Sequence, residues 1–460
     1  MSSALEALDE VKVNKFHWKT VFTAGMGFFT DAYDLFIIGT VTAILTPLWH
    51  LSTAQLAVLN STSLASAALG ALIFGPLMDR LGRRRMYGVE VMVLTLGAIL
   101  SALAPNFGWL VFFRAVVGFG VGGDYPTSSV ITSEFANRER RGYLVTMVFA
   151  MQGLGLLVGP LVASILLASG IPHDLVWRVM LGLGAIPAAS VIFLRRQMPE
   201  TPRYLMAVKG DVKAAARVVS EMTGKGDLEA ESLTMRTQSL WTRKNLIRLV
   251  ATAGSWFLID VAFYGNGVSS QLILKSLLPH APLTTTVLVT ALLFLVAALP
   301  GYFVAARFMD RLGRKTIQAT GFLVMMAAYA VIFLVPRVVA MPAAFLLVYA
   351  LSYFFVEFGP NTTTFLVPAE VFPTNLRGTG HGISAAAGKV GAFVGAFFLP
   401  LVLKASGLEN TMGLLALVSL MGAALTWLWL PEMRQVSLET TEELVDGAQS
   451  NPSLTGTRIS

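Results

Sequence analysis

The chain has no cysteine and few charged residues. None of its 460 residues is Cys, and only 13% are Asp, Glu, Lys or Arg. The absence of cysteine excludes disulfide bonds, thiol catalysis and cysteine-ligated metal sites. Because a soluble domain carries about 25% charged residues, half that proportion leaves too few charges to cover a surface in water. The composition therefore excludes an ordinary cytosolic enzyme, a disordered protein and a secreted disulfide scaffold.

Motifs for nucleotide or metal chemistry are missing as well. The sequence contains no GxxxxGK[ST] loop, no zinc-ligand spacing and no catalytic-triad pattern. We therefore expect no enzymatic activity, no cofactor and no bound metal. Without an ATP-binding loop, any uphill transport must draw its energy from an ion gradient or from the gradient of the substrate itself.

Long apolar runs fill most of the chain. Hydrophobic residues make up 55% of the sequence, and the 41 glycines suit membrane helices, where Gly is commoner than in soluble ones. A run of about 20 apolar residues is long enough to cross a bilayer. The pattern predicts an all-α membrane protein, with no cleavable signal peptide because residues 1–17 are polar and the first apolar run is too long. The twelve predicted transmembrane helices are, roughly, 18–47, 54–79, 86–104, 107–135, 143–170, 175–195, 246–276, 284–309, 316–336, 341–369, 378–405 and 409–430.

Lysine and arginine are concentrated in alternate loops. They follow the second, fourth, sixth, eighth and tenth predicted spans, whereas the opposite loops hold only Arg337. By the positive-inside rule, both termini and the long central loop lie in the cytoplasm. The net charge of +7 is thus a topology signal, and no basic face of a soluble domain predicts nucleic-acid binding. The expected surroundings are a lipid bilayer.

The sequence contains an internal repeat of half its length. Residues 70–83 read GALIFGPLMDRLGR and residues 301–314 read GYFVAARFMDRLGR. A Glu seven residues before an Arg-Gly pair, and a Pro-Glu pair after the sixth and twelfth spans, recur at similar offsets. Two parallel sets of six spans form the layout of a major-facilitator transporter. The predicted divisions are an N-terminal segment 1–17, a six-helix bundle 18–195, a central loop 196–245 with an amphipathic helix in DVKAAARVVSEM, a second six-helix bundle 246–430 and a tail 431–460.

The repeated charged residues are expected to brace helices and gate movement rather than touch a substrate. Asp79 and Asp310 fall at helix ends, where a cation or a helix N-terminus can neutralise them. The full set of predicted gating or structural residues is Asp79, Arg80, Arg83, Glu134, Arg141, Asp310, Arg311, Arg314, Glu370 and Arg377.

Several charged residues fall well inside the predicted spans. A charge at mid-bilayer costs about 2.5–3.5 kcal/mol on insertion scales, so each is a functional candidate. They must face a polar interior, form pairs or be protonated. They are Asp31, Asp34, Glu90, Arg114, Asp124, Asp260, Glu357 and Lys389.

Helical spacing groups some of these residues. Asp31 and Asp34 share a face, as do Glu357 and Asn361, and Trp256, Asp260 and Tyr264 form one stripe. Arg114 lies ten residues, about 15 Å, before Asp124, which is too far for a direct pair. We expect it to meet a carboxylate from the first or third span; for Arg114 and Glu90, a structural ion pair and a proton relay are both open. In GVGGDYPTSS around Asp124, Gly and Pro are expected to loosen the helix toward a cavity.

The polar residues of the spans suit a small oxyanion. Lys389 offers an ammonium, and hydroxyl, amide and indole groups offer further donors. An ionised Asp would repel an anion, whereas a protonated Asp would donate a hydrogen bond to it. Protonation would therefore favour anion binding, and the linkage is reciprocal. A sugar would use similar donors but would not need Lys389.

Several segments resemble known transporter families. DRLGR, PETPRYL at 199–205 and PEMRQVSLE at 431–439 resemble the sugar-porter-like group of the major facilitator superfamily. Within it, the chain resembles the phosphate:proton symporter family. The segments that carry this second resemblance are FFTDAYDLF at 28–36, GVGGDYPTSSVITSE at 120–134, FAMQGLG at 149–155, WFLIDVAFYG at 256–265, FGPNTTTFLVPAEVFPT at 358–374 and HGISAAAGK at 381–389.

The resemblance implies a phosphate site and a proton route. The implied substrate-binding residues are Asp124, Tyr125, Gln152, Trp256, Asp260, Tyr264, Asn361 and Lys389. The implied proton-coupling residues are Asp31 or Asp34, Glu90, Arg114 and Asp124. The chain departs from the family's pattern at two places. Glu357 stands where the family has a neutral residue, which adds a carboxyl to the proton-coupling candidates. Thr127-Ser128-Ser129 follows GGDYP, where the family usually has Leu-Ser-Ala.

The resulting hypothesis is a proton-coupled symporter of inorganic phosphate, monomeric, working by alternating access. The short central loop suggests a prokaryotic plasma membrane. A symporter of another small organic anion, such as an aromatic or monocarboxylic acid, is the main alternative. A sugar porter comes third, and a membrane sensor on a transporter fold would need a long soluble domain that the sequence lacks.

Overall fold

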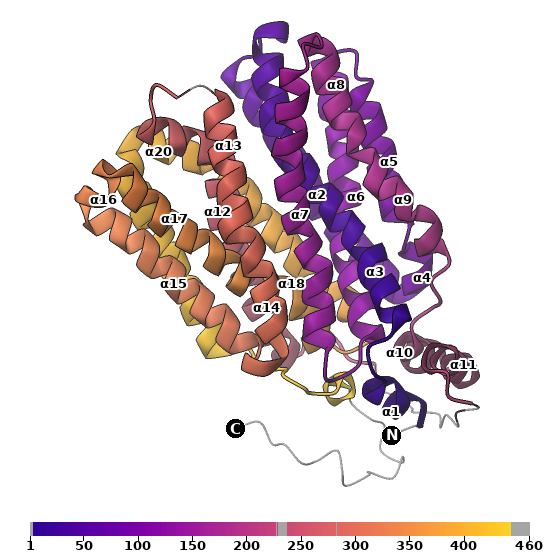
Figure 1. Ribbon diagram of the computed structural model, residues 1–460. Helices are drawn as coiled ribbons and strands as arrows, with labels where there is room; N and C mark the ends of the chain where they lie inside the picture. Colours follow the sequence, from indigo (N-terminus) through magenta and orange to yellow (C-terminus); the bar gives the residue numbers. More distant parts are fainter. Residues whose placement is uncertain (1–2, 227, 229–236, 282, 443–460) are drawn as a thin grey trace.

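The computed structural model describes residues 3–226, 228, 237–281 and 283–442, and every regular element within them is helical. In Figure 1 the indigo-to-magenta helices form one bundle and the orange-to-yellow helices form a second bundle beside it. This is the predicted twelve-helix major-facilitator fold. The first bundle contains α2 (Lys15–Trp49), α3 (Thr53–Leu81), α4 (Arg83–Met86), α5 (Val89–Ala102), α6 (Phe107–Phe135), α7 (Arg141–Ala168), α8 (His173–Leu183) and α9 (Ala185–Arg196).

The second bundle has more interruptions than the first. Its elements are α12 (Arg243–Leu277), α13 (Leu283–Leu293), η2 (Phe294–Ala298), α14 (Leu299–Leu312), α15 (Arg314–Leu334), α16 (Pro336–Ala340), α17 (Pro342–Val356), η3 (Glu357–Asn361), α18 (Thr362–Leu366), α19 (Pro368–Val371) and α20 (Arg377–Trp429). Both η2 and η3 are π-helical turns. Gly359 in η3 has φ −107° and ψ −112°, and Pro360 follows it, so the tenth span is kinked there.

Eleven helical segments of the described chain are long and apolar enough to cross a membrane. The last of them, α20, bends at Gly407, whose φ of 82° lies where glycine is favoured. Its two arms, 377–406 and 408–429, are the eleventh and twelfth spans. By contrast, α6 is an unbroken helix through Asp124 and Pro126, so the expectation of a loosened helix there is wrong.

The bundles are apolar outside and partly polar inside. Phe193 and Leu347 are 69% and 74% exposed, whereas Asp260 and Lys389 are both 1% exposed. This distribution suits a protein whose outer surface faces lipid tails, which leave buried polar groups to be satisfied within the protein. Small residues let helices of the two bundles touch, since a Cβ on Gly75 of α3 would lie 2.5 Å from the Gly378 carbonyl oxygen of α20.

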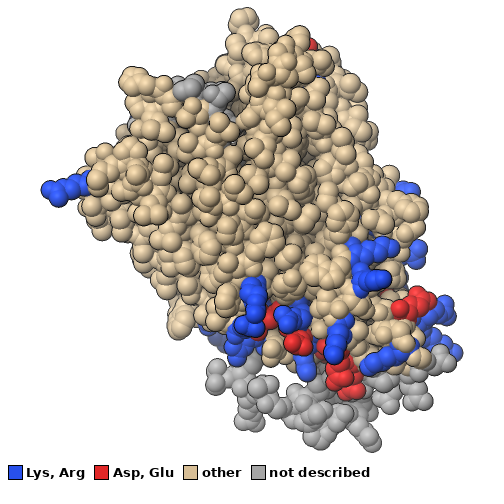
Figure 2. All heavy atoms as spheres, in the orientation of Figure 1, with Lys and Arg blue, Asp and Glu red and all other residues tan. Residues whose placement is uncertain are grey.

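Charged side chains gather at one end of the molecule, which we call the basic end (Figure 2). The short helices α1 (Ser3–Glu10), α10 (Pro202–Tyr204) and α11 (Val212–Thr223) lie there, as Figure 1 shows. The prediction of an amphipathic helix in the central loop is confirmed by α11, which buries Ala215, Val219 and Met222. Its N-terminus is capped by Asp211, whose side chain accepts from the Ala214 N–H.

Candidate functional site

A buried ammonium lies between the two bundles. The Nζ atom of Lys389, on α20, donates to the hydroxyl oxygens of Tyr125 (2.8 Å) and Tyr264 (2.7 Å). It also lies 4.1 Å from the ring centroid of Tyr125, a cation–π distance. Tyr125 in turn donates to the Asp31 carboxylate at 2.7 Å. Three predicted residues from three helices, α6, α12 and α20, thus form one hydrogen-bonded group, and Tyr125 links this group to a carboxylate of α2.

The predicted stripe on α12 faces this ammonium. Trp256, Asp260 and Tyr264 are each at most 3% exposed. The Trp256 ring packs 5.8 Å from that of Tyr125 and 5.4 Å from that of His381. The Asp260 Oδ2 atom is buried and has no hydrogen-bond partner among the described residues. The stripe therefore brings a second carboxyl to the region around the Tyr264–Lys389 hydrogen bond.

A second polar group connects α7 with η3. Tyr302 donates to the Gln152 Oε1 atom at 2.8 Å. Asn361 Nδ2 lies 3.4 Å from the same oxygen and 2.6 Å from Glu357 Oε2. The structure therefore brings Gln152 and Asn361 together as predicted, adds Glu357 to them and adds Tyr302, which sequence reasoning missed. Tyr302 lies inside the repeated segment 301–314, whose charged residues were expected to brace helices, so nothing in the sequence indicated a binding residue there.

The charge balance of these two groups limits what they can bind. They contain one ammonium, Lys389, and three carboxyls, Asp31, Asp260 and Glu357. With all three ionised, the region would carry net negative charge and repel an anion. With carboxyls protonated, Lys389 and the hydroxyl and amide donors can bind oxyanion oxygens. The arrangement therefore suits a small anion that enters together with protons.

Asp124 lies in a different cluster from its neighbour Tyr125. Arg195, on α9, donates to Asp124 Oδ1 at 2.7 Å and to Asp124 Oδ2 at 3.1 Å. The same guanidinium donates to Glu90 Oε1 at 2.8 Å. Ser128 completes the cluster by donating to Asp124 at 2.5 Å. Sequence reasoning missed Arg195 because it falls where the sixth span meets the basic loop and reads as an orientation signal.

Arg114 pairs with the first span and not with Glu90. Its Nη1 atom lies 2.5 Å from Asp34 Oδ1, and its Nη2 atom donates to Ser63 at 2.8 Å. The expectation of a partner from the first or third span is confirmed for the first span, while an Arg114–Glu90 pair is wrong because Arg195 binds Glu90. Asp31 and Asp34 share a face but have different partners, a tyrosine and an arginine.

The repeated aspartates join the two bundles at the basic end. Asp79 accepts from the backbone N–H groups of Gly378 (2.9 Å) and Thr379 (2.7 Å), at the start of α20. Asp310 accepts equivalently from Gly142 (3.0 Å) and Tyr143 (2.7 Å), at the start of α7. Each aspartate thus satisfies free N–H groups at a helix N-terminus of the other bundle, and the helix dipole favours its charge.

The repeated glutamates form matching ion-pair networks next to these contacts. Glu134 binds Arg83 (3.0 Å) of its own bundle and Arg377 (2.7 Å) of the other. Glu370 binds Arg314 (2.7 Å) and Arg141 (2.8 Å) in the same way. Each glutamate therefore bridges the bundles, and these buried pairs must break if the basic end opens. The side chains of Arg80 and Arg311, predicted for the same set, are exposed.

Outside the spans, one arginine joins three distant parts of the chain. Arg203, after the sixth span, donates to Asp9 Oδ1 of α1 at 2.5 Å and to Glu439 Oε1 of η4 (Leu438–Thr441) at 2.8 Å. The Ser437 hydroxyl lies within hydrogen-bond distance of both carboxylates. Burial alone would raise the pKa of Glu439, but the Arg203 guanidinium and these hydrogen bonds lower it to about 2.

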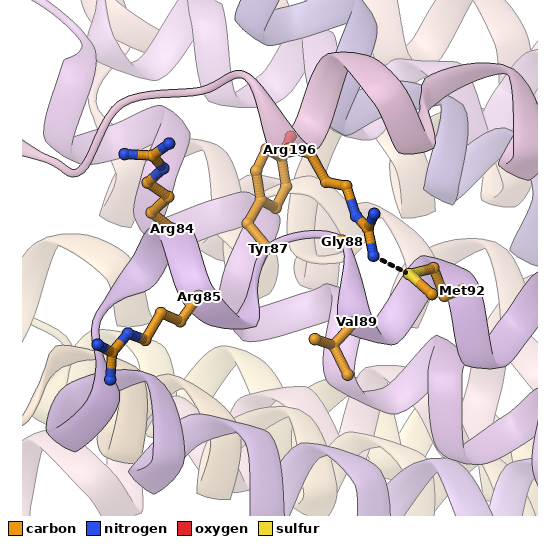
Figure 3. Close-up of a pocket in the computed structure, with 7 residues that line it drawn as sticks. All are labelled: Arg84, Arg85, Tyr87, Gly88, Val89, Met92 and Arg196. Atoms are coloured by element: carbon orange, nitrogen blue, oxygen red, sulfur yellow. Dashed lines mark hydrogen bonds between the residues drawn. The ribbon is translucent and has the colours of Figure 1, made fainter.

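A hollow of about 360 Å³ also lies at the basic end, beside α4 and α5 (Figure 3). Arg84, Arg85 and Arg196 border it, and Val89 and Met92 form its apolar part. In Figure 3 the guanidinium groups of Arg84 and Arg85 point away from Arg196, whose Nη2 atom contacts the Met92 sulfur at 3.3 Å. None of the predicted substrate-binding residues lines this hollow, so it is peripheral to the candidate site.

The two bundles of membrane-spanning helices enclose a buried polar centre and are held together at the basic end by paired charge networks. These features define an integral membrane transporter of the major-facilitator fold and not an enzyme. The family model described as "Sugar (and other) transporter" matches residues 15–445, and the chain belongs to that family.

Similar full-length relatives are plant proteins. The chain is 36% identical to "Probable inorganic phosphate transporter 1-6" of Arabidopsis thaliana, with 95% of each chain covered. It is 37% identical to "Inorganic phosphate transporter 1-4" of the same plant, with 97% of each covered. It is 36% identical to "Low affinity inorganic phosphate transporter 1" of Petunia hybrida, with 97% and 96% covered. These plant relatives give no support to the expected prokaryotic origin.

Solved structures of a xylose transporter share the fold. The proton:xylose symporter XylE bound to 6-bromo-6-deoxy-D-glucose superposes with a TM-score of 0.79 at 20% identity, over 92% of this chain and 98% of the other. An inward-open structure of XylE from E. coli gives a TM-score of 0.65 at 21% identity, over 92% and 99%. At this identity the likeness establishes the fold alone.

Proposed function

We propose that this transporter carries inorganic phosphate together with protons by alternating access. The observation that carries the proposal is the buried ammonium of Lys389, which binds two tyrosine hydroxyls and lies next to carboxyls. The names of the relatives, all inorganic phosphate transporters, support phosphate as the anion. The proposed substrate-binding residues are Tyr125, Gln152, Trp256, Asp260, Tyr264, Asn361 and Lys389, with Asp124 at the edge of the site.

Asp31 provides a direct link between proton and anion binding. While Asp31 is ionised, it balances the charge of Lys389 and holds the Tyr125 hydroxyl. Once Asp31 is protonated, the ammonium lacks its counter-ion and the Tyr125 O–H is free to donate to a phosphate oxygen. Bound phosphate in turn stabilises protonated Asp31, because linkage between two ligands is reciprocal.

The clusters of the first bundle supply the rest of the proposed proton route. Asp34 with Arg114, and Glu90 with Asp124 and Arg195, are buried ion pairs on helices that border the site. A proton that arrives at Asp124 or Glu90 would weaken the ion pair of that carboxylate with Arg195, which lies on α9. Such a change could be passed to α2, because Arg195 also donates to the Thr23 and Ala24 carbonyl oxygens of that helix.

The charged contacts of the basic end act as the proposed gate. Asp79, Asp310 and the networks of Glu134 and Glu370 hold that end closed, and their breakage would open the site toward it. The positive-inside pattern supports a cytoplasmic basic end with both termini there. We further propose that the transporter functions as a monomer. Its location in a prokaryotic plasma membrane is supported only by the short central loop.

Uptake by purified protein in proteoliposomes tests the substrate. Labelled phosphate should accumulate when the external pH is lowered relative to the lumen, and excess unlabelled phosphate should compete. Lys389→Ala should abolish this uptake, and Asp124→Asn should abolish its dependence on the proton gradient. Uptake of a monocarboxylic acid or a sugar without phosphate uptake would refute the proposal, as would normal accumulation by Lys389→Ala.

A further inference from the structure

Four polar side chains follow one face of the tenth span. Tyr349, Tyr353, Glu357 and Asn361 recur every four residues along α17 and η3, and each is at most 3% exposed. Tyr349 and Glu357 are eight residues apart, about 12 Å of helix. In Figure 1, α17 runs from the end opposite the basic end toward the centre of the bundle. The stripe thus leads from that end to Asn361, a proposed substrate ligand.

The carboxyl in this stripe has no cationic partner. Glu357 Oε2 accepts from Asn361 at 2.6 Å, and the Tyr302 hydroxyl also interacts with this carboxyl, whereas the buried Oε1 atom has no partner within the hydrogen-bond limits among the described residues. No Lys, Arg or His nitrogen of the described chain lies within ion-pair distance of Glu357.

The groups that face Glu357 are neutral or acidic. Asp260 and Tyr264 face it from α12, Tyr302 from α14 and Tyr353 from its own helix. From α15 the contact is made by Gly321, which packs against the turn at Gly359. An uncompensated carboxylate in the membrane interior is costly. A protonated carboxyl avoids that cost and can donate a hydrogen bond.

Buried hydroxyl groups lie on the same helix face as Glu357. The hydroxyl groups of Tyr349 and Tyr353 are buried and interact with each other, and the two rings pack edge to face with centroids 5.1 Å apart. Asn266 donates to the Tyr329 hydroxyl at 2.8 Å, and among the described side chains its own Oδ1 atom has no hydrogen-bond partner. Hydroxyls both donate and accept, so a row of them can pass a proton along hydrogen bonds.

The stripe is not required by the repeated architecture. The offset of 236 residues that relates Glu370 to Glu134 places Val121, Val117 and Phe113 at the positions of Glu357, Tyr353 and Tyr349. The first bundle therefore builds the equivalent helix with apolar residues at these three positions. The polar face belongs to the second bundle alone, which favours a role in transport over a role in the common scaffold.

We propose that Glu357 binds a proton that reaches it from the end opposite the basic end, along the hydroxyls of Tyr349 and Tyr353. This proton is additional to the one at Asp31, and it enters through the second bundle instead of the first. Neutral Glu357 then leaves Asn361 and Gln152 in a region without net negative charge when the anion arrives. The coupling part of the proposal rests on the proposed phosphate symport; the proton-binding part does not.

Infrared spectroscopy of the full chain in lipid tests proton binding without any substrate. The wild-type spectrum should contain a carbonyl band of a buried protonated carboxyl that Glu357→Gln removes and Glu357→Asp retains. Glu357→Gln preserves an oxygen that accepts from Asn361. If Glu357 only accepted this hydrogen bond and bound no proton, the variant would therefore lose no carbonyl band. An unchanged spectrum in Glu357→Gln would overturn the proposal even if phosphate proves not to be the substrate.

Two further measurements test the route and the coupling. Tyr353→Phe should slow deuterium exchange of the Glu357 carboxyl at least tenfold. The matched control is Tyr33→Phe, which removes a buried hydroxyl bonded to the Met180 carbonyl in the first bundle. Equal exchange rates in the two variants would refute the route. In proteoliposomes with a pH-sensitive dye, Glu357→Gln should lower the ratio of protons to phosphate by one, and an unchanged ratio would refute the coupling.

Discussion

Replacing Arg195 by methionine gives the sharpest test of the buried charge arrangement. Arg195 is fully buried and forms ion pairs with Glu90 and Asp124, at 2.8 and 2.7 Å, and no other cation of the described chain pairs with these two carboxylates. Methionine has similar length but no charge, so the variant leaves two carboxylates in the membrane interior without a cation. It also removes the donors to the Thr23 and Ala24 carbonyl oxygens of α2.

The expected destabilisation is large. Breaking one buried pair by removing one partner costs about 3–5 kcal/mol, and two stranded carboxylates place Arg195→Met at the upper end. With an unfolding entropy of roughly 2 cal/mol/K per residue, this chain should lose on the order of 5 °C in Tm. The half-exposed pair of Arg178 with Asp174, at 3.5 Å, is the matched control. Arg178→Met should lower Tm by clearly less than Arg195→Met, because an exposed pair contributes about 0–1 kcal/mol and the variant otherwise loses only the donor to the Ala102 and Ala104 carbonyl oxygens.

Thermal unfolding of the purified variants in lipid nanodiscs provides the measurement. The triple variant Arg195→Met, Glu90→Gln, Asp124→Asn should recover more than half of the loss, because it removes the stranded charges together with the cation. The Tm deficit of Arg195→Met should also shrink at low pH, as the stranded carboxylates take up protons. Equal losses in Arg195→Met and Arg178→Met, or no recovery in the triple variant, would show that the ion cluster does not stabilise the first bundle.

Three further predictions concern the gate, the segments outside the spans and the site. Asp79→Asn should weaken the hold on the start of α20 and increase labelling of the basic end by a membrane-impermeant reagent severalfold, whereas unchanged labelling would remove Asp79 from the gate. Because the pKa of Glu439 is depressed to about 2, its contribution is present above its usual pKa and is lost only as pH falls toward 2. Glu439→Gln, which weakens its contact with Arg203, should therefore lower Tm equally at pH 5.5 and 7.5, and a loss confined to pH 7.5 would contradict this. Gly388→Ala places a Cβ 2.4 Å from Trp256 Cδ1, so it should weaken phosphate binding at least tenfold, and an unchanged binding isotherm would exclude the indole from the site.

The fold could be predicted in outline because its physical cause is local. Apolar runs of bilayer length specify helices wherever they occur in the chain, and the repeat of GALIFGPLMDRLGR specifies two equivalent halves. The break between the last two spans was placed to within a few residues of Gly407, the residue whose positive φ allows the bend. The uninterrupted course of α6 through Asp124 and Pro126 was not predicted, because it packs along its length against α3 and α5, which local sequence does not reveal.

The candidate site was only partly predictable. Helical spacing placed Trp256, Asp260 and Tyr264 on one face, and the structure buries all three. Spacing within a helix does not predict contacts between different helices, however. The hydrogen bond from Lys389 to Tyr125 and the contacts of Tyr302 with Gln152 and Asn361 were therefore not predicted. Arg195 was missed because an arginine at a span boundary has the same sequence signature whether it points to lipid headgroups or into the bundle.

The scarcity of charge and the absence of cysteine determined by themselves that this chain lies in a membrane and works without thiol or disulfide chemistry. The repeat determined the two-bundle architecture. Only the tertiary structure decided which partners the buried charges have: Asp34 pairs with Arg114, Glu90 and Asp124 pair with Arg195, and Asp31 binds Tyr125 beside Lys389. Glu357 pairs with no cation of the described chain. The physical reason is that a buried charge is stabilised by the groups that pack within a few ångströms of it. Those groups come from other helices, and the separation of two helices along the chain does not show which of their residues are in contact.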